Sequence, residues 1–212
     1  MCKLKSGIIF KDRIFVPDYD HHTEMLEELG IEDTRENAER LFVRAELFPK
    51  NGDIFSNIDE WTFNVDQDIV PGWFVAECEK ARMIEAVKAW AKCHIFVGVD
   101  NLTLENGKNF YLKNCNYVSC KNSSVEAWEN SSVEAWGNSS VVARENSSVV
   151  ARENSSVVAR GNSIVTKPTW SSFNIDRLVL SENSTFKDCV TKTIYQSGDY
   201  KLVTVTDGKI GG

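Results

Sequence analysis

Hydrophobic and polar positions between Lys121 and Thr166 repeat every eight residues. The units read NSSVEAWE, NSSVEAWG, NSSVVARE, NSSVVARE, NSSVVARG and NSIVTKPT, and asparagines eight residues apart extend this frame upstream to Asn106. In the first five units, counted from the Asn, positions 1 to 4 and 6 are constant, while positions 5, 7 and 8 vary. Self-similarity at a fixed period indicates a repeat architecture.

The alternation within each unit predicts a β-strand with one small, constant face. Because strands alternate faces, Ser123, Val125 and Ala127 with their copies should point inward, while Glu126 and Trp128 should point outward. The corner should then fall at positions 8, 1 and 2, with Asn in the left-handed conformation that a tight corner requires. Stacked copies would place the Asn side chains in a ladder that satisfies corner amides.

Two other structures compete for this pattern. A helix matches neither the 3.6 nor the 3.5 residue period and would need better helix formers than Asn-Ser-Ser-Val. An antiparallel meander would need a partner face that small Ser, Val and Ala side chains supply poorly. Parallel stacking of identical rungs places like residues over like residues, so the repeat predicts a parallel β-solenoid.

The length of one coil stays open between two octads, which make sixteen residues, and three octads, which make twenty-four. Small interior side chains favour two octads. Rungs about 4.8 Å apart would then let each Arg lie over a neighbouring Trp as a cation–π pair. On one face, the expected outer columns are Trp128, Arg144 and Arg160 beside Glu126, Val142 and Val158. On the other face, they are Cys120, Trp136 and Arg152 beside Val118, Glu134 and Val150. Valines beside arginines are a candidate binding patch, although ordinary strand propensity also explains them.

The residues before the repeat predict a small α+β domain. Residues 4–16 indicate a hairpin through Lys11-Asp12, and residues 41–48 and 61–70 alternate as two further strands. Helices are expected after an Asp20 N-cap up to Gly30, at Thr34 to Arg40 with Asp33 or Thr34 as cap, and at about Phe74 to His94. His94 should complement the C-terminus of the last of these helices.

Three regions follow from these patterns: an α+β head at 1–98, an octapeptide-repeat solenoid at 99–180 and a β cap at 181–212. Bulky Leu102, Leu104, Phe110 and Leu112 suit a capping coil at the start of the solenoid. A hairpin around Ser197-Gly198-Asp199 should close its other end, since bare end rungs leave unpaired edges.

Charge and cysteine content limit the partners and the compartment. Residues 1–100 carry 12 Lys/Arg against 20 Asp/Glu, a balance of −8, whereas residues 101–212 carry 12 against 11, a balance of +1. The acidic half argues against direct nucleic-acid binding and suits a basic partner. The six cysteines form no C-x-x-C pair, and no signal peptide or membrane span is evident. We therefore expect reduced thiols and a cytoplasmic location.

Candidate chemistry in the head centres on Asp18, Asp20, His21 and His22 at a strand-to-helix junction. Histidine beside carboxylates can act as a general base, and Arg44, Glu46 and Asp66-Gln67-Asp68 could converge on it. An enzyme would use His22 as the base, with Asp20, Glu46 or Asp66 assisting, in one concave pocket. The spacing matches no motif with known chemistry, and acidic residues at a helix start are usually caps, so we expect no catalytic residue, metal or cofactor.

The repeat resembles β-solenoids in the broad sense that includes pentapeptide-repeat and hexapeptide-repeat proteins. With its acidic head, the VDQD and IVPGWF segments and the NSSVEAW/NSSVVAR units, the chain also resembles repeat-bearing proteins encoded by bacteriophages and mobile elements. Near-verbatim copies suggest recent duplication, which binding arms tolerate better than catalytic scaffolds do.

Three functions follow as hypotheses. The first is a non-enzymatic interaction protein that binds, and could also inhibit, a host macromolecule such as a defence or nucleic-acid enzyme. Its solenoid would be a rigid arm or a self-association surface, with Trp128, Trp136, Arg144, Arg152, Arg160, Val142, Val150 and Val158 as binding residues. The second is a small hydrolase or nucleotide-handling enzyme with its site in the head. The third is a structural component of a phage particle, which would favour trimers.

Overall fold

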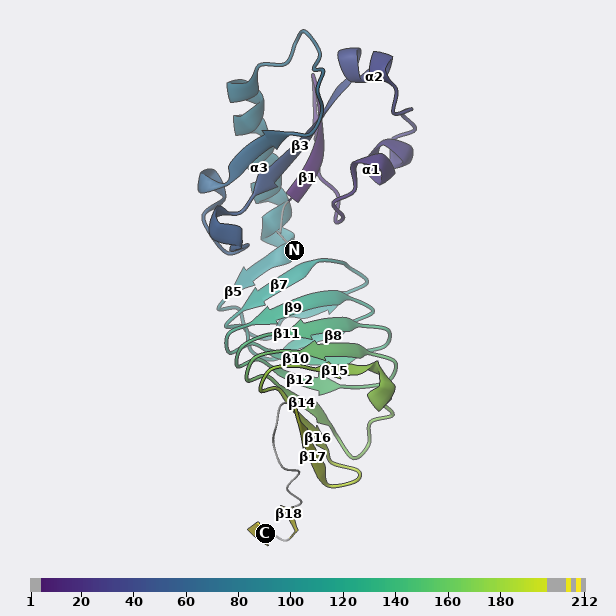
Figure 1. The fold of residues 1–212 in the computed structure, drawn as a ribbon, viewed down its shortest axis with the longest axis vertical. Coiled ribbons are helices and arrows are strands. Elements are labelled where there is room, and N and C mark those ends of the chain that lie inside the picture. The colour runs from purple at the N-terminus through teal and green to yellow at the C-terminus, as the bar shows by residue number, and fades with distance from the viewer. Residues whose placement is uncertain (1–4, 198–204, 207–208, 211–212) are drawn as a thin grey trace. The chain divides into compact units, whose positions relative to one another are not determined.

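The computed structural model describes residues 5–197, 205–206 and 209–210, and the chain divides into two compact units, Met1–Ile95 and Phe96–Gly212 (Figure 1). The first unit contains a four-stranded antiparallel sheet in the order β2-β1-β3-β4. Its strands are β1 Lys5–Phe10, β2 Ile14–Phe15, β3 Phe42–Phe48 and β4 Thr62–Val65. Val43, Ala45 and Leu47 on alternate positions of β3 are fully buried, as the predicted alternation requires.

Helices α1 His22–Glu28, α2 Arg35–Arg40 and α3 Ala76–His94 complete this unit, together with the 3-10 turns η1 Lys50–Gly52 and η2 Ile58–Glu60. Thr34 caps α2 by accepting the Asn37 N–H, and Gly30 follows α1 with φ +66°, so both predicted signals are confirmed. Asp20 does not cap α1: the N-cap is His21, whose side chain makes no cap hydrogen bond. The Asp20 carboxylate instead accepts the backbone N–H of Ser6.

Helix α3 packs on the sheet through a face that includes Met83 and Val87, both fully buried. A side chain at Gly7 of β1 would place its Cβ only 2.9 Å from Met83 Cε. Gly7 therefore allows the close approach of helix and strand. At the end of the helix, His94 Nδ1 lies 2.8 Å from the Trp90 carbonyl oxygen and Nε2 lies 2.9 Å from Asp18 Oδ1.

The second unit is a parallel β-solenoid of about four turns, which confirms the central prediction from the repeat. One sheet has seven strands: β6 Thr103–Glu105, β8 Val118–Lys121, β10 Ser132–Trp136, β12 Ser148–Ala151, β14 Ile164–Lys167, β16 Thr185–Asp188 and β17 Thr193–Gln196. The other has six: β5 Ile95–Val97, β7 Phe110–Lys113, β9 Ser124–Trp128, β11 Ser140–Ala143, β13 Ser156–Ala159 and β15 Leu178–Leu180, with the turn η3 Ile175–Arg177 before β15.

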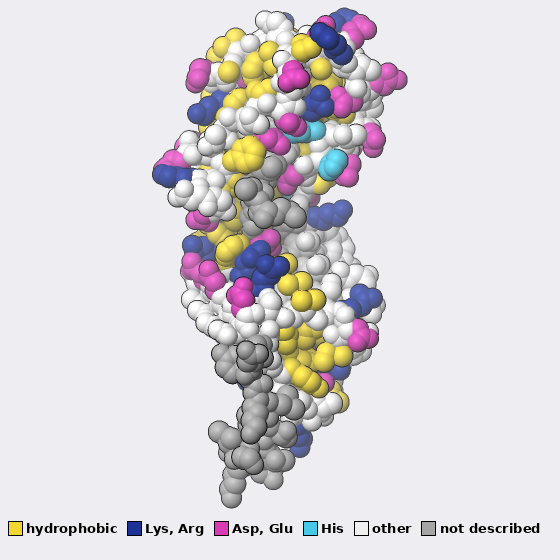
Figure 2. Space-filling view, in the orientation of Figure 1, with side chains coloured by type: hydrophobic (Ala, Val, Ile, Leu, Met, Phe, Trp, Pro, Cys, Tyr) yellow, Lys and Arg dark blue, Asp and Glu magenta, His cyan; other side chains and the backbone are white. Residues whose placement is uncertain are grey.

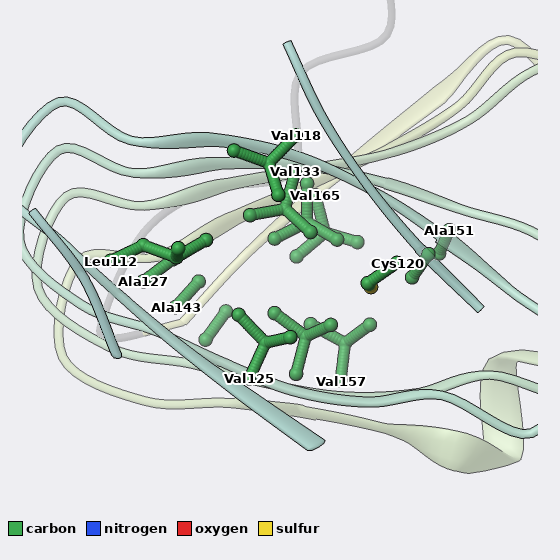
Figure 3. Close-up of a cluster of buried hydrophobic side chains, with 14 of the residues drawn as sticks. Leu112, Val118, Cys120, Val125, Ala127, Val133, Ala143, Ala151, Val157 and Val165 are labelled. Carbon is green, nitrogen blue, oxygen red and sulfur yellow. The ribbon is translucent and has the colours of Figure 1, made fainter. Parts of the chain in front are cut away.

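Like residues lie over like residues in the repeat. Ser132, Val133 and Ala135 of β10 pair with Ser148, Val149 and Ala151 of β12, and β11 pairs with β13 in the same way. Each partner lies two octads further along the chain, so a coil here holds two octads. Val118, Val133 and Val165 from one sheet face Val125 and Val157 from the other in a thin apolar interior (Figure 3).

The register shifts by one residue at the upstream edge of the repeat. Val118 pairs with Val133 and Cys120 with Ala135, a separation one residue short of two octads, and both Val118 and Cys120 are buried. The prediction that they lie in outer columns is therefore wrong. The shift arises at the corner after β8, where four residues separate Cys120 from Val125 but five separate Ala135 from Val141.

Burial raises the pKa of the Cys120 thiol to about 11, since a thiolate is poorly solvated in an apolar interior. Cys115 is also fully buried, and its backbone N–H donates to Ser131 Oγ. Cys115 thus occupies the column that serine fills in the later coils.

The predicted corner geometry holds only upstream. Asn106, Asn114 and Asn122 have positive φ, but from the next octad onward the left-handed residue is at position 8, namely Glu129, Gly137, Glu145, Glu153 and Gly161. Asn at position 1 is not left-handed at these later corners. The one-residue shift in register explains the change: Lys113 pairs with Trp128 and Lys121 with Trp136, so Asn114 and Asn122 lie in the columns that Glu129 and Gly137 occupy one coil later.

Corner amides are satisfied by side chains from the next coil. The Glu129 N–H donates to Glu145 Oε2 at 3.1 Å, and the Gly137 N–H donates to Glu153 Oε2 at 2.7 Å. The expected Asn ladder is also present, for example between Asn130 Nδ2 and Asn114 Oδ1 at 3.1 Å. Each corner therefore depends on the coil stacked next to it.

The repeated serines at position 2 are buried and hydrogen-bonded. Ser131 Oγ donates to the Trp128 carbonyl at 2.8 Å, and Ser155 Oγ donates to the Arg152 carbonyl at 2.7 Å. A buried hydroxyl without a partner would cost free energy. These bonds explain why Ser rather than Ala recurs in this interior column.

Larger side chains close the solenoid at both ends. Leu104 and Leu112 are buried upstream, with Leu102 and Phe110 packed against them, and Phe173 and Phe186 are buried downstream. Strand β17 adds antiparallel to β16. The expected hairpin turn includes Gly198 and Asp199, which lie outside the described residues; two short strands, β18 Val205–Thr206 and β19 Lys209–Ile210, pair antiparallel.

Removing one whole coil should harm the fold less than removing one residue. Deletion of residues 138–153 leaves Gly137 joined to Asn154 with an unchanged repeat, so we expect a folded protein with a cooperative thermal transition. Deletion of Val142 alone turns Ala143 outward and Arg144 inward within β11. We expect that variant to lose its cooperative melt by circular dichroism; equal melting of the two deletions would contradict this register.

Candidate functional site

Tryptophan and arginine side chains on the outside of the solenoid pair between neighbouring coils, as predicted. The Arg144 guanidinium lies 4.6 Å from the Trp128 ring centroid, and that of Arg152 lies 3.8 Å from the Trp136 ring. Arg152 is also 3.5 Å from the ring of Trp170, which the sequence had not singled out. Arg152 therefore contacts two aromatic rings.

Carboxylates at position 5 reinforce these pairs. Arg144 Nε lies 3.4 Å from Glu126 Oε2, and Arg152 forms an ion pair with Glu134. Burial lowers the pKa of the Arg152 guanidinium, although the group remains a cation at any ordinary pH. Other side chains of the solenoid thus contact four of the proposed binding residues, namely Trp128, Trp136, Arg144 and Arg152. Arg160, in contrast, is exposed.

The proposed valines form a different kind of surface. Val142 pairs with Val158 and Val158 with Val179 across β11, β13 and β15, giving a column of three outward valines, here called the valine column. Val179 is 56% exposed and belongs to the irregular residues after the repeat, where no period marked it. Apolar and basic side chains lie next to one another on the visible face of this unit (Figure 2).

Val150 lies on the other sheet, beside a small hollow. This hollow has a volume of about 250 Å³ and is lined by Tyr117, Val118, Glu134 and Val150, among others. Val150 is therefore separated from Val142 and Val158, and the eight proposed binding residues do not form one continuous patch.

The head gathers three of its four candidate catalytic residues. Ligand atoms of His22, Glu46 and Asp66 all lie within 4.8 Å of one another, and we call these residues the head cluster. His22 comes from the first turn of α1, Glu46 from β3 and Asp66 from the residue after β4. The Asp66 N–H donates to the Arg44 carbonyl at 2.9 Å, and this contact extends the β3–β4 pairing up to the cluster.

Specific contacts orient the side chains of the head cluster. His22 Nδ1 lies 3.1 Å from Asp66 Oδ2, and Nε2 lies 3.2 Å from the Ala45 carbonyl oxygen. Asn64 Nδ2 donates to Glu46 Oε2 at 3.2 Å. Histidine and acidic side chains adjoin on the visible face of this unit (Figure 2). One imidazole and two carboxylates form a donor set that suits a divalent transition metal.

Asp20 and Arg44 have other partners. Lys5 Nζ lies 2.7 Å from Asp20 Oδ1, and Arg44 pairs with Asp33 at 2.9 Å. Burial lowers the pKa of Lys5 although Asp20 opposes this effect, so Asp20 stabilises a buried ammonium rather than assisting His22. The three cavities described in this unit are lined by residues outside the head cluster.

Fold and surface together define the class: a parallel β-solenoid protein with a helix-containing β-sheet head. Comparison with protein-family models, with curated proteins and with solved structures finds no match to this chain. None of the helices within the described residues is long and apolar enough to span a membrane.

Replacing Arg152 should destabilise the solenoid more than replacing Arg160 does. The Arg152→Ala variant loses contacts with Trp136, Trp170 and Glu134, and we expect it to lower the free energy of unfolding by about 1–2 kcal/mol. The Arg160→Ala variant removes an exposed side chain and should change that free energy by less than about 0.5 kcal/mol. Urea unfolding followed by circular dichroism measures both, and equal losses would show that the stacking of Arg152 contributes little.

Proposed function

We propose that this protein is a non-enzymatic interaction protein that binds a host macromolecule, specifically a protein, through the outer face of its solenoid. The observation that supports this proposal is the valine column on the six-stranded sheet. Val142, Val158 and Val179 stack at neighbouring positions, and β-sheet geometry spaces such rows about 4.8 Å apart. Val179 is exposed and Val142 and Val158 are half-buried, and outward apolar side chains in register give a flat surface suited to a protein partner.

Polar side chains border the valine column on both sides. Ser140 and Ser156 pair with each other on one side of the valine column, and Arg144 and Arg160 lie on its other side, in adjacent coils. Interfaces combine an apolar centre with a polar rim and are enriched in arginine. The chemistry favours a partner that presents apolar side chains flanked by carboxylates.

The rigidity of the solenoid also supports a binding role. A surface held by main-chain pairing and buried side chains changes little on binding, which reduces the entropy lost when partners associate. The resemblance of the octapeptide units to proteins of bacteriophages and mobile elements suggests a bacterial host protein as the partner, such as a defence enzyme that the bound solenoid inhibits.

Charge placed in the valine column should abolish binding without unfolding the solenoid. We expect wild-type protein to enrich a partner from bacterial host lysate, and the Val142→Lys/Val158→Lys variant to bind the purified partner at least tenfold more weakly. The matched control is Val150→Lys/Thr166→Lys, which alters the equivalent, mutually paired positions of the other sheet.

Circular dichroism should show that both double variants are folded, and light scattering should show whether the partner is a second copy of the chain. Equal binding by the two double variants would overturn the assignment of this face. Failure of the wild-type protein to enrich any partner over a bead control would count against the interaction function.

A second candidate, a small hydrolase or nucleotide-handling enzyme, is favoured by the head cluster. His22 lies within hydrogen-bond distance of the Asp66 carboxylate, the kind of arrangement that orients a general base. If the head is such an enzyme, phosphomonoester or nucleoside triphosphate hydrolysis should fall by about 10²-fold or more in His22→Ala. The exposed neighbour His21→Ala serves as control; hydrolysis that is absent, or equal in both variants, would refute this candidate.

A further inference from the structure

We infer that His22, Glu46 and Asp66 form a binding site for one divalent transition-metal ion of the zinc type. The argument begins with the environment of the imidazole. The His22 side chain is only 9% exposed, and its Nε2 lies 3.2 Å from the carbonyl oxygen of Ala45. A carbonyl oxygen can only accept, so Nε2 carries the proton.

That tautomer leaves an unshared electron pair on Nδ1 of a neutral imidazole. Nδ1 lies 3.1 Å from Asp66 Oδ2, and a carboxylate oxygen is also an acceptor. Two facing acceptors repel each other unless a proton or a metal ion lies between them. A metal ion coordinated by both atoms satisfies them together, and the Ala45 carbonyl then has the role of the outer contact that commonly fixes the tautomer of a metal-bound histidine.

The distances suit such an ion. Zinc binds imidazole nitrogen at about 2.0–2.1 Å and carboxylate oxygen at about 2.0–2.2 Å, so tetrahedral ligand atoms lie roughly 3.4 Å apart. The separation of His22 Nδ1 and Asp66 Oδ2 is close to this value, and the ligand atom of Glu46 lies within 4.8 Å of both. Small rotations of the Glu46 side chain bring its carboxylate within bonding distance of an ion held by His22 and Asp66.

The surrounding residues support the two carboxylates. Asn64 Nδ2 donates to Glu46 Oε2 at 3.2 Å and holds it toward the cluster. The neighbouring arginine on β3, Arg44, is paired with Asp33 at 2.9 Å, so its charge is balanced by another carboxylate. The cluster thus offers two acidic side chains beside one imidazole, a donor set that favours a divalent cation.

The donor set also selects among metals. One nitrogen and two oxygens suit Zn²⁺, Mn²⁺ or Fe²⁺ better than Mg²⁺ or Ca²⁺, which prefer oxygen ligands alone. Asp66 is exposed, and three protein ligands leave a coordination position for water, as in catalytic rather than structural zinc sites. The inference concerns binding only, so it is measured independently of both functions proposed above.

Calorimetric titration of the full chain with Zn²⁺ at neutral pH tests the site. Cys2, Cys78, Cys93 and Cys189 are first changed to Ser, so that these thiols do not compete for the metal. We expect one ion per chain, and an affinity at least tenfold lower in His22→Ala and in Asp66→Asn. His21→Ala and Asp68→Asn are matched controls that change neighbouring residues of the same types and should retain binding; Mg²⁺ should bind far more weakly than Zn²⁺.

Further outcomes distinguish a metal site from a simple ion pair. A protonated His22 that donates to Asp66 would satisfy the same geometry, and the wild-type protein would then bind no Zn²⁺ in a saturable way. That result overturns the inference, as does equal affinity in the wild type, His22→Ala and Asp66→Asn. Asn64→Ala provides a second test in a folded protein, because loss of an outer contact should weaken Zn²⁺ binding by about 10-fold.

Discussion

Stacking of identical small side chains two octads apart is the constraint on which the solenoid depends. Val over Val and Ala over Ala fill a space between two sheets that holds only one layer of small side chains from each (Figure 3). A larger residue would separate the sheets, and a smaller one would leave a cavity. Because these regular rungs have the same interior side chains, their strands pair in the same register from coil to coil.

Corners add a second dependence between coils. A left-handed Glu or Gly directs its N–H toward the carboxylate of the next coil, as Glu129 does toward Glu145. Lys113 lies 2.8 Å from Glu129, and this contact is the main reason that the pKa of the Glu129 carboxyl is lowered. A single octad cannot satisfy these groups, so the structure is stable only as a stack.

The repeat made the solenoid, its inward residues and the Trp–Arg pairs predictable, because all of them follow from period and alternation. The one-residue shift at the corner between Cys120 and Val125 was not predictable, since the spacing of asparagines stayed at eight while the strand register moved by one. The head cluster combines His22, Glu46 and Asp66 from three separate segments. Residue types suggested these candidates, but only the tertiary fold separates Asp66, which contacts His22, from Asp20, which pairs with Lys5.

Structural demands leave few positions of the octad free to change. Positions 2, 4 and 6 are buried, positions 8 and 1 make the corner bonds, and position 7 stacks with its copies in the next coil. Position 5 points outward and varies between units: Glu126 and Glu134, which pair with Arg144 and Arg152, give way there to Val142, Val150 and Val158. Substitutions there change the chemistry of the surface at little cost in stability, so recognition of a partner is most easily encoded at position 5.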